Sequence, residues 1–131
     1  MAIFAVGANY DGDDVSPQFI AQGVAGVGWD HASAPELHQL MASLKVGDIV
    51  YIKAYAPSSP DIIVKGIGFI RDAVFLDGQA TNNLVSAGRN VEWRVVEEFR
   101  IQKPTERYNV RLNSAYEEFH PAVQAQILSR I

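Results

Sequence analysis

The hydrophobic period of the sequence changes at residues 46–48 (VGD), and this change constrains the fold more than any other feature. After it, residues 48–56 (DIVYIKAYA) alternate with the period of 2 that is typical of a β-strand. Before it, apolar residues recur at the helical spacing i, i+3, i+4 and i+7: Leu37, Leu40, Met41 and Leu44. The pattern predicts a helix that packs an apolar stripe on a core, followed by a strand.

We expect several further strands, which follow one another along the sequence. Because no long helices separate them, we expect an α+β fold whose sheet is a small, curved antiparallel β barrel with flanking helices. Gly66 and Gly68 share one face of a strand, which indicates tight bending or close packing by a bulky neighbour. The expected strands are residues 2–8, 61–71, a short strand from residue 75 followed by a mobile loop to residue 87, 91–101 and 108–112.

Local signals also predict the shorter helices. Ser16 precedes Pro17 and Gly23 offers a left-handed stop, which together predict a helix over 16–22. The glycine-rich segment 24–29 is a strand or turn that another backbone or a ligand can approach closely.

Two more helix boundaries follow from capping and proline. Ser33 and Glu36 form a capping box that begins the helix carrying the leucine stripe. Residues 114–131 are expected to close the chain as a helix interrupted near His120-Pro121.

Composition limits the class of protein. The 131 residues predict a single domain over 1–131, and 48% hydrophobic residues allow a real core. The formal net charge of −4 argues against a basic coat for nucleic acid and against a polybasic membrane binder. The absence of cysteine excludes disulfides, thiolate metal sites and cysteine nucleophiles. The first residues lack a signal peptide and no apolar run reaches membrane-spanning length, so a cytoplasmic location with no membrane partner is expected.

Catalytic and metal-binding motifs fail when their spacing is tested. Residues 11–14 (DGDD) resemble the start of a calcium loop, but its twelfth position carries Gln22 in place of a carboxylate. The three histidines lack metal-ligand spacing, no G-x-S-x-G elbow occurs, and the glycines at 66–68 lack the third glycine of a dinucleotide fingerprint. We expect no metal, no cofactor and no enzymatic activity.

Aromatic and polar residues near predicted strand ends form the remaining candidate site. Aromatic faces stack on a base for about 1–3 kcal/mol each, while amides and carboxylates read its polar edge. In the alternative interpretation, the aromatic side chains lie at the edge of the core and the lysine extends to solvent. The candidates for a ligand pocket are Asn9, Tyr10, Trp29, Asp30, Tyr51, Lys53 and Tyr55.

Four short strings carry a resemblance to a known family: GAN after the first strand, GWD after the first helix, KVGDI before a strand ending in IK, and IIVKGIGFI. They resemble the PUA-like superfamily, in particular EVE-type modules and related specificity domains of modification-dependent restriction proteins. The similarity covers residues 3–71. It implies a curved β barrel with flanking helices, and binding of RNA or DNA through a pocket that accepts a flipped modified base. It also implies pocket roles for Asn9, Tyr10, Trp29, Asp30 and Lys53, with less force for Tyr51 and Tyr55.

Three functional hypotheses follow. The first is a non-enzymatic binding module for a nucleobase-like ligand, such as a modified base in DNA or RNA. The second is a protein-interaction or regulatory partner that acts through sheet edges, for example as a homodimer. The third is an enzyme acting on a small molecule. Convergence of Tyr10, Trp29 and Lys53 on one concavity favours the first hypothesis, and their separation favours the second.

Overall fold

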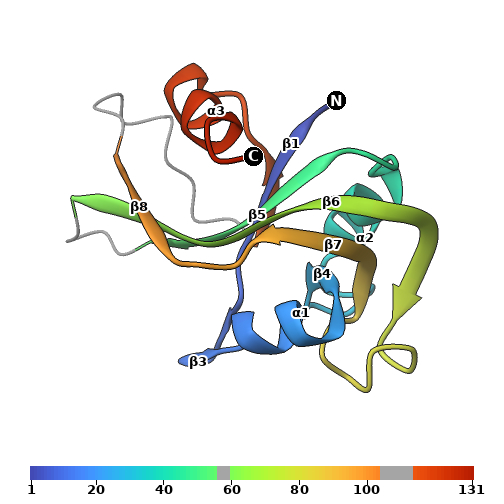
Figure 1. Ribbon diagram of the computed structural model, residues 1–131. Helices are drawn as coiled ribbons and strands as arrows, with labels where there is room; N and C mark the ends of the chain where they lie inside the picture. The colour runs from blue at the N-terminus through green and yellow to red at the C-terminus, as the bar shows by residue number, and fades with distance from the viewer. Residues whose placement is uncertain (56–59, 104–113) are drawn as a thin grey trace.

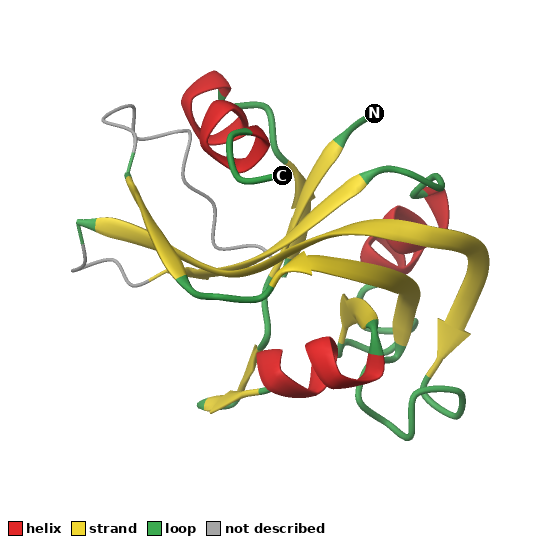
Figure 2. Cartoon of the chain, viewed as in Figure 1, coloured by secondary structure: helices red, strands yellow, loops and turns green. Residues whose placement is uncertain are grey.

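A computed structural model describes residues 1–55, 60–103 and 114–131 of the chain (Figures 1 and 2). The helices are α1 (Ser16–Gln22), α2 (Pro35–Ser43) and α3 (Pro121–Leu128). The strands are β1 (Ile3–Val6), β2 (Asn9–Tyr10), β3 (Asp13–Asp14), β4 (Val24–Val27), β5 (Ile49–Tyr55), β6 (Asp61–Asp77), β7 (Ala87–Val95), β8 (Phe99–Gln102) and β9 (Ala115–Glu117). Across the described part of the chain, each helix is too short or too polar to span a lipid bilayer.

The fold is α+β, as the sequence predicts. One sheet has the strand order β4-β7-β6-β5-β1-β9, with β8 also paired to β6, and a small hairpin joins β2 and β3. The pairing is antiparallel except between β1 and β5. The sheet is curved (Figure 1), but no ladder joins β4 to β9 among the described strands, so the expected closure into a barrel is not seen. The predicted strand at 108–112 lies outside the described residues.

Strand β6 is longer than predicted, because it continues without a break through the residues that were expected to start a separate short strand. It bends sharply near its end (Figure 2). Close packing at its glycines is confirmed: a Cβ on Gly66 or Gly68 would lie 3.4 or 3.0 Å from Cε3 of Trp93. The indole therefore occupies the space that side chains at these two positions would need.

The single strand predicted for 91–101 is wrong. The structure has two strands, β7 and β8, that pair with successive parts of β6. Val95 lies opposite Ile67 and Phe99 opposite Val64, so three residues on one chain span two on the other. This extra residue bends the chain away from the ladder, and it explains why Val96 is exposed although it is apolar.

Helix α1 has the predicted bounds, and Gly23 ends it in the left-handed conformation with φ of 67°. Ser16 is not its N-cap, however. The residue is already helical, and its N–H and hydroxyl both donate to Oδ1 of Asp14, at 2.9 and 2.7 Å. The predicted serine cap is therefore wrong: the N-cap is Val15, and Ser16 instead binds the carboxylate of Asp14, two residues before it.

The capping box predicted for α2 is also wrong. The N-cap is Ala34, whose methyl side chain cannot accept a hydrogen bond, and the N–H of Ser33 donates to Oδ1 of Asp30. The predicted helix at 114–131 is correct only after Pro121, because Ala115–Glu117 pairs with β1 as strand β9. Tertiary pairing overrides local helix propensity there.

The sheet is covered on both faces, so it separates two apolar cores. Alternate residues of β5 enter different cores: Val50 and Ile52 pack with α1 and α2, whereas Ile49 and Tyr51 pack with α3. Figure 1 shows α1 and α3 on opposite sides of the sheet. The core packing predicted for the leucine stripe is confirmed, since Met41 and Leu44 are buried and Leu37 and Leu40 pack against the same cluster.

The glycine-rich segment forms β4, which pairs with β7 so that Gly26 faces Gly88. A Cβ on Gly26 would lie 2.2 Å from the carbonyl oxygen of Ala87, closer than any real contact. Glycine at this position therefore permits the close backbone approach that the sequence predicts.

Candidate functional site

A pocket of about 630 Å³ opens where the ends of several strands meet. Strands β1 and β5 are parallel neighbours, so their carboxyl ends lie at the same edge of the sheet. Strand β9 is antiparallel to β1 and starts at that edge, and the end of β4 lies beside it. The volume lies within the range of about 300–1,000 Å³ that is common for small-molecule sites. The lining residues are Ala5, Val6, Gly7, Ala8, Asn9, Tyr10, Asp11, Val27, Gly28, Trp29, Lys53, Ala54, Ser114 and Tyr116.

Four of the seven candidate residues line this one pocket: Asn9, Tyr10, Trp29 and Lys53. They come from β2, from the segment after β4, and from β5, which are far apart in the sequence. The three side chains whose convergence distinguishes the ligand-binding hypothesis therefore share one concavity.

Trp29 offers the pocket an exposed aromatic surface, since 56% of the residue is accessible to solvent. Its Nε1–H donates to Oγ of Ser114 at 2.8 Å. Its backbone carbonyl accepts from Nε2 of His38 at 2.6 Å, which fixes that ring nitrogen as the protonated one. The contact with Ser114 orients the indole, and the contact with His38 fixes the backbone that carries it.

Tyr10 presents a buried hydroxyl that finds no hydrogen-bond partner among the described atoms. Its ring packs edge-on against Phe19, with centroids 6.3 Å apart, and a Cβ on Gly28 would lie 3.3 Å from its Cζ. Burial raises the pKa of Tyr10 to about 12, so the hydroxyl keeps its proton at neutral pH. A polar ligand atom would supply the missing partner, because an unsatisfied buried hydroxyl costs free energy.

Asn9 shapes the hairpin that carries Tyr10. Its Oδ1 accepts from the N–H of Gly12 at 3.0 Å, across a turn in which Asp11 and Gly12 have φ of 52° and 92°. The residues that resemble the start of a calcium loop are thus the turn and second strand of a hairpin.

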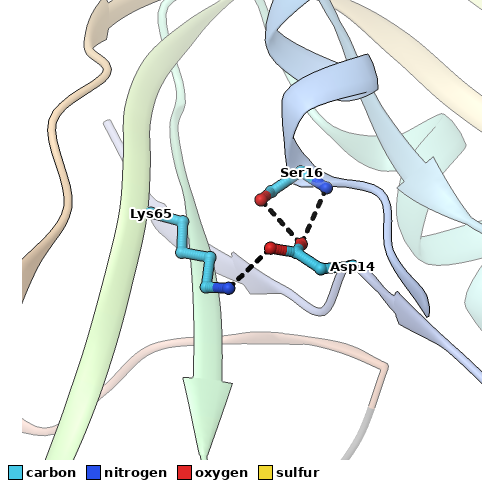
Figure 3. Close-up of polar contacts among 3 residues, drawn as sticks. All are labelled: Asp14, Ser16 and Lys65. Atoms are coloured by element: carbon cyan, nitrogen blue, oxygen red, sulfur yellow. Dashed lines mark hydrogen bonds and ion pairs between the residues drawn. The ribbon is translucent and has the colours of Figure 1, made fainter. Parts of the chain in front are cut away.

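The same hairpin is tied to the main sheet through Asp14 (Figure 3). Nζ of Lys65 on β6 lies 2.6 Å from Oδ2 of Asp14, while Ser16 occupies the other carboxylate oxygen. Partial burial raises the pKa of Asp14, but the hydrogen bonds from Lys65 and Ser16 outweigh this and lower it below its ordinary value. The ion pair fixes one end of the hairpin relative to β6.

Lys53 is buried at the pocket, with 8% of its surface exposed. Its Nζ donates to the hydroxyl of Tyr116 and lies 4.8 Å from the centroid of that ring. The lysine does not extend to solvent, in contrast to the alternative interpretation of the sequence.

The other three candidates do not meet at the pocket. Tyr51 is fully buried in the core beneath α3, where its hydroxyl donates to Oε1 of Glu118 at 2.5 Å. Asp30 is exposed; hydrogen bonds from Ser33 lower its pKa, and it stabilises the turn before α2. The backbone of Tyr55 pairs with β6, and its side chain lies outside the described structure.

Sequence reasoning missed the residues of β9 and its neighbours, namely Ser114, Tyr116 and Glu118. Three residues are too few to show a period of 2, and the segment also fits the start of a helix. The one available signal is His120-Pro121, because a proline favours a helix start at that point.

Within the described ranges, no group of three or more histidine or acidic side chains could hold a metal ion. No protein-family model matches the chain, and no curated protein matches it with significant similarity. The chemistry of the pocket therefore carries the functional argument.

Proposed function

We propose that this chain is a non-enzymatic binding module that holds a flat, nucleobase-like ligand, such as a modified base of DNA or RNA, in the pocket beside Trp29. The observation that carries this proposal is the convergence of Tyr10, Trp29 and Lys53 on one hollow of suitable size. The resemblance to PUA-like and EVE-type domains, whose curved barrels hold bases, agrees with it.

Each polar and aromatic group has a role in such a complex. Trp29 supplies a face for stacking, which contributes about 1–3 kcal/mol per base. The Tyr10 hydroxyl and the Lys53 ammonium offer donors to the carbonyl oxygens and ring nitrogens at the edge of a base. The flat ring would thus be held by its face and its edge together.

The test is a titration of the full chain with short oligonucleotides that carry modified or unmodified bases, followed through Trp fluorescence and anisotropy. We expect saturable binding for at least one modified base. Trp29→Ala should weaken it at least about tenfold, because the stacking surface is lost. Tyr10→Phe should weaken it less, because only the hydroxyl is removed.

Phe119→Ala is the matched control. Phe119 is an aromatic residue that is 67% exposed and lies outside the pocket, so its truncation removes similar surface without touching the site. Absence of saturable binding for every oligonucleotide, or equal weakening by Trp29→Ala and Phe119→Ala, would contradict the proposal.

A second candidate is self-association through the β9 edge of the sheet. Phe119 and Leu128 are exposed apolar residues beside β9, and both line a second hollow of about 840 Å³. A second copy of the chain could add its own edge strand and cover these side chains. Light scattering that gives a dimer mass in the wild type and a monomer mass in Phe119→Asp would favour this candidate, whereas a monomer at all concentrations would exclude it.

A further inference from the structure

A series of hydrogen-bonded, buried polar groups connects the pocket to the apolar core beneath α3. It starts at Lys53, whose Nζ donates to the Tyr116 hydroxyl, and Tyr116 is hydrogen-bonded to Tyr51. Tyr51 donates to Oε1 of Glu118 at 2.5 Å, and Glu118 is only 3% exposed. The other oxygen of Glu118 accepts from the N–H of His120 at 3.2 Å.

Lys53 and Glu118 are the two end groups, and their chemistry sets the direction of every hydrogen bond in this series. A carboxylate only accepts and an ammonium only donates, so the one proton of Tyr51 goes to Glu118, and that of Tyr116 goes to Tyr51. Burial raises the pKa of the Tyr51 hydroxyl, and Tyr116 and Glu118 raise it further, so this proton stays in place. The buried carboxylate is therefore coupled to the ammonium at the pocket through two hydroxyl groups.

The charges around the pocket are balanced. Of the described residues that line it, Lys53 and Asp11 carry formal charge, and their signs are opposite. Glu118 adds a negative charge behind Lys53, and the whole chain carries −4. An anionic ligand would thus lose its hydration without meeting excess positive charge, whereas a neutral acceptor would not bear that cost.

We propose that the pocket selects an uncharged, hydrogen-bond-accepting heterocycle over an anionic form of the same ring. Glu118 is the positioning residue that sets this selectivity, because its carboxylate balances the charge of Lys53 through the two tyrosines. This inference rests on the proposed function and adds the electrostatic class of the ligand to it.

The experiment compares probes that differ at one ring position, where one carries a neutral formyl group and the other an anionic carboxylate: 5-formylcytidine against 5-carboxycytidine, and 5-formyluridine against 5-carboxyuridine. Dissociation constants are measured by NMR titration of the full chain. We expect the wild type to prefer the formyl probe about tenfold. In Glu118→Gln the dissociation constant of the carboxy probe should fall, while that of the formyl probe stays within about twofold of the wild-type value. The preference for the formyl probe should therefore shrink by about tenfold. General damage to the fold would weaken both probes alike.

Glu117→Gln is the matched control, because Glu117 is the last residue of β9 and directly precedes Glu118, carries the same charge, and lines the other hollow. Its ratio of the two dissociation constants should equal that of the wild type. Lys53→Met provides the opposite change: loss of the ammonium should widen the preference for the formyl probe, and this variant decides the question if Glu118→Gln folds poorly.

The outcomes separate the two proposals. Binding with an unchanged ratio in Glu118→Gln and Lys53→Met overturns the inference and leaves the proposed function standing. Preference of the wild type for the carboxy probe also overturns it. Absence of saturable binding for all four nucleosides overturns the inference, and the oligonucleotide titration then decides the proposed function separately.

Discussion

Arg89 is a buried cation, with 2% of its surface exposed, and its guanidinium is surrounded by backbone carbonyls. Its Nη1 donates to the carbonyls of Met41 and Leu44 at the end of α2, and its Nε and Nη2 donate to those of Val74 and Asp72 on β6. A positive charge at a helix carboxyl end is favourable, and four otherwise unpaired carbonyls are satisfied. The role of this arginine is therefore structural.

Arg89→Met should therefore destabilise the fold by about 3 kcal/mol, because the buried carbonyls lose their donors. Urea denaturation followed by circular dichroism measures the free energy of unfolding. Arg94→Met is the control: this exposed arginine pairs with exposed Glu92 at 3.2 Å, and its loss should change stability by less than about 1 kcal/mol. Equal effects of the two substitutions would show that the guanidinium contacts contribute little.

At the residue scale, the sequence predicts the part of the site that follows strand ends. Asn9, Tyr10 and Trp29 stand where apolar segments stop, and Lys53 breaks an apolar strand, so each is conspicuous in the pattern. Strand alternation alone could not distinguish Lys53 from Tyr51, because both lie on the same side of β5 and only the packing of α3 and β9 buries the tyrosine completely.

At the element scale, the hairpin β2/β3 depends on the ion pair between Asp14 and Lys65. Because the folded-state pKa of Asp14 is lowered, its contribution to stability is fully present above the ordinary aspartate value of 3.8. It is lost as pH falls through the lowered value. Asp14→Asn should therefore remove one component of the acid destabilisation expected below about pH 4, while lowering stability at neutral pH.

Urea denaturation between pH 2.5 and 7 checks this prediction for the wild type and Asp14→Asn. The control is Asp13→Asn, an exposed neighbour on the same strand, which should leave the pH profile close to that of the wild type. Identical profiles for the wild type and Asp14→Asn would contradict the assigned role of the ion pair.

The pairing of β4 with β7 depends on glycine at Gly26. Because a Cβ there would overlap the carbonyl of Ala87, Gly26→Ala should cost at least about 2 kcal/mol through overpacking. The nearest atom to a Cβ on Gly7 is 3.8 Å away, so Gly7→Ala should change stability by less than about 1 kcal/mol. Thermal unfolding of both variants provides the comparison, and equal melting temperatures would refute the argument.

Elements with a complete local signal were predicted well. Helix α1 is bounded by Pro17 and Gly23, and β5 alternates cleanly, so their positions follow from the sequence. The break between β7 and β8 was missed because alternation resumes after it, with Glu97 as the one exception, and only the path of β6 imposes the bend. Strand β9 was missed because its partner, β1, lies at the other end of the sequence.

At the scale of the whole molecule, the sequence predicts the α+β class and the curvature, since consecutive strands and paired glycines are local features. The open strand order and the two-sided covering depend on contacts between distant segments. The hydrophobic periodicity of a single strand does not reveal these contacts, because a strand buried on both faces and a strand at the edge of a sheet can have the same sequence pattern.

The position of β1 between β5 and β9 has a consequence for synthesis. Strand β1 leaves the ribosome before both of its neighbours, and Ala115–Glu117 emerges long after it. Until β9 has been translated, β1 lacks its full set of backbone partners, and such non-local pairs slow folding. The edge of the sheet where strand ends form the pocket is therefore assembled last, and a nascent chain that stalls before β9 would expose Ile3–Val6 to chaperones or to aggregation.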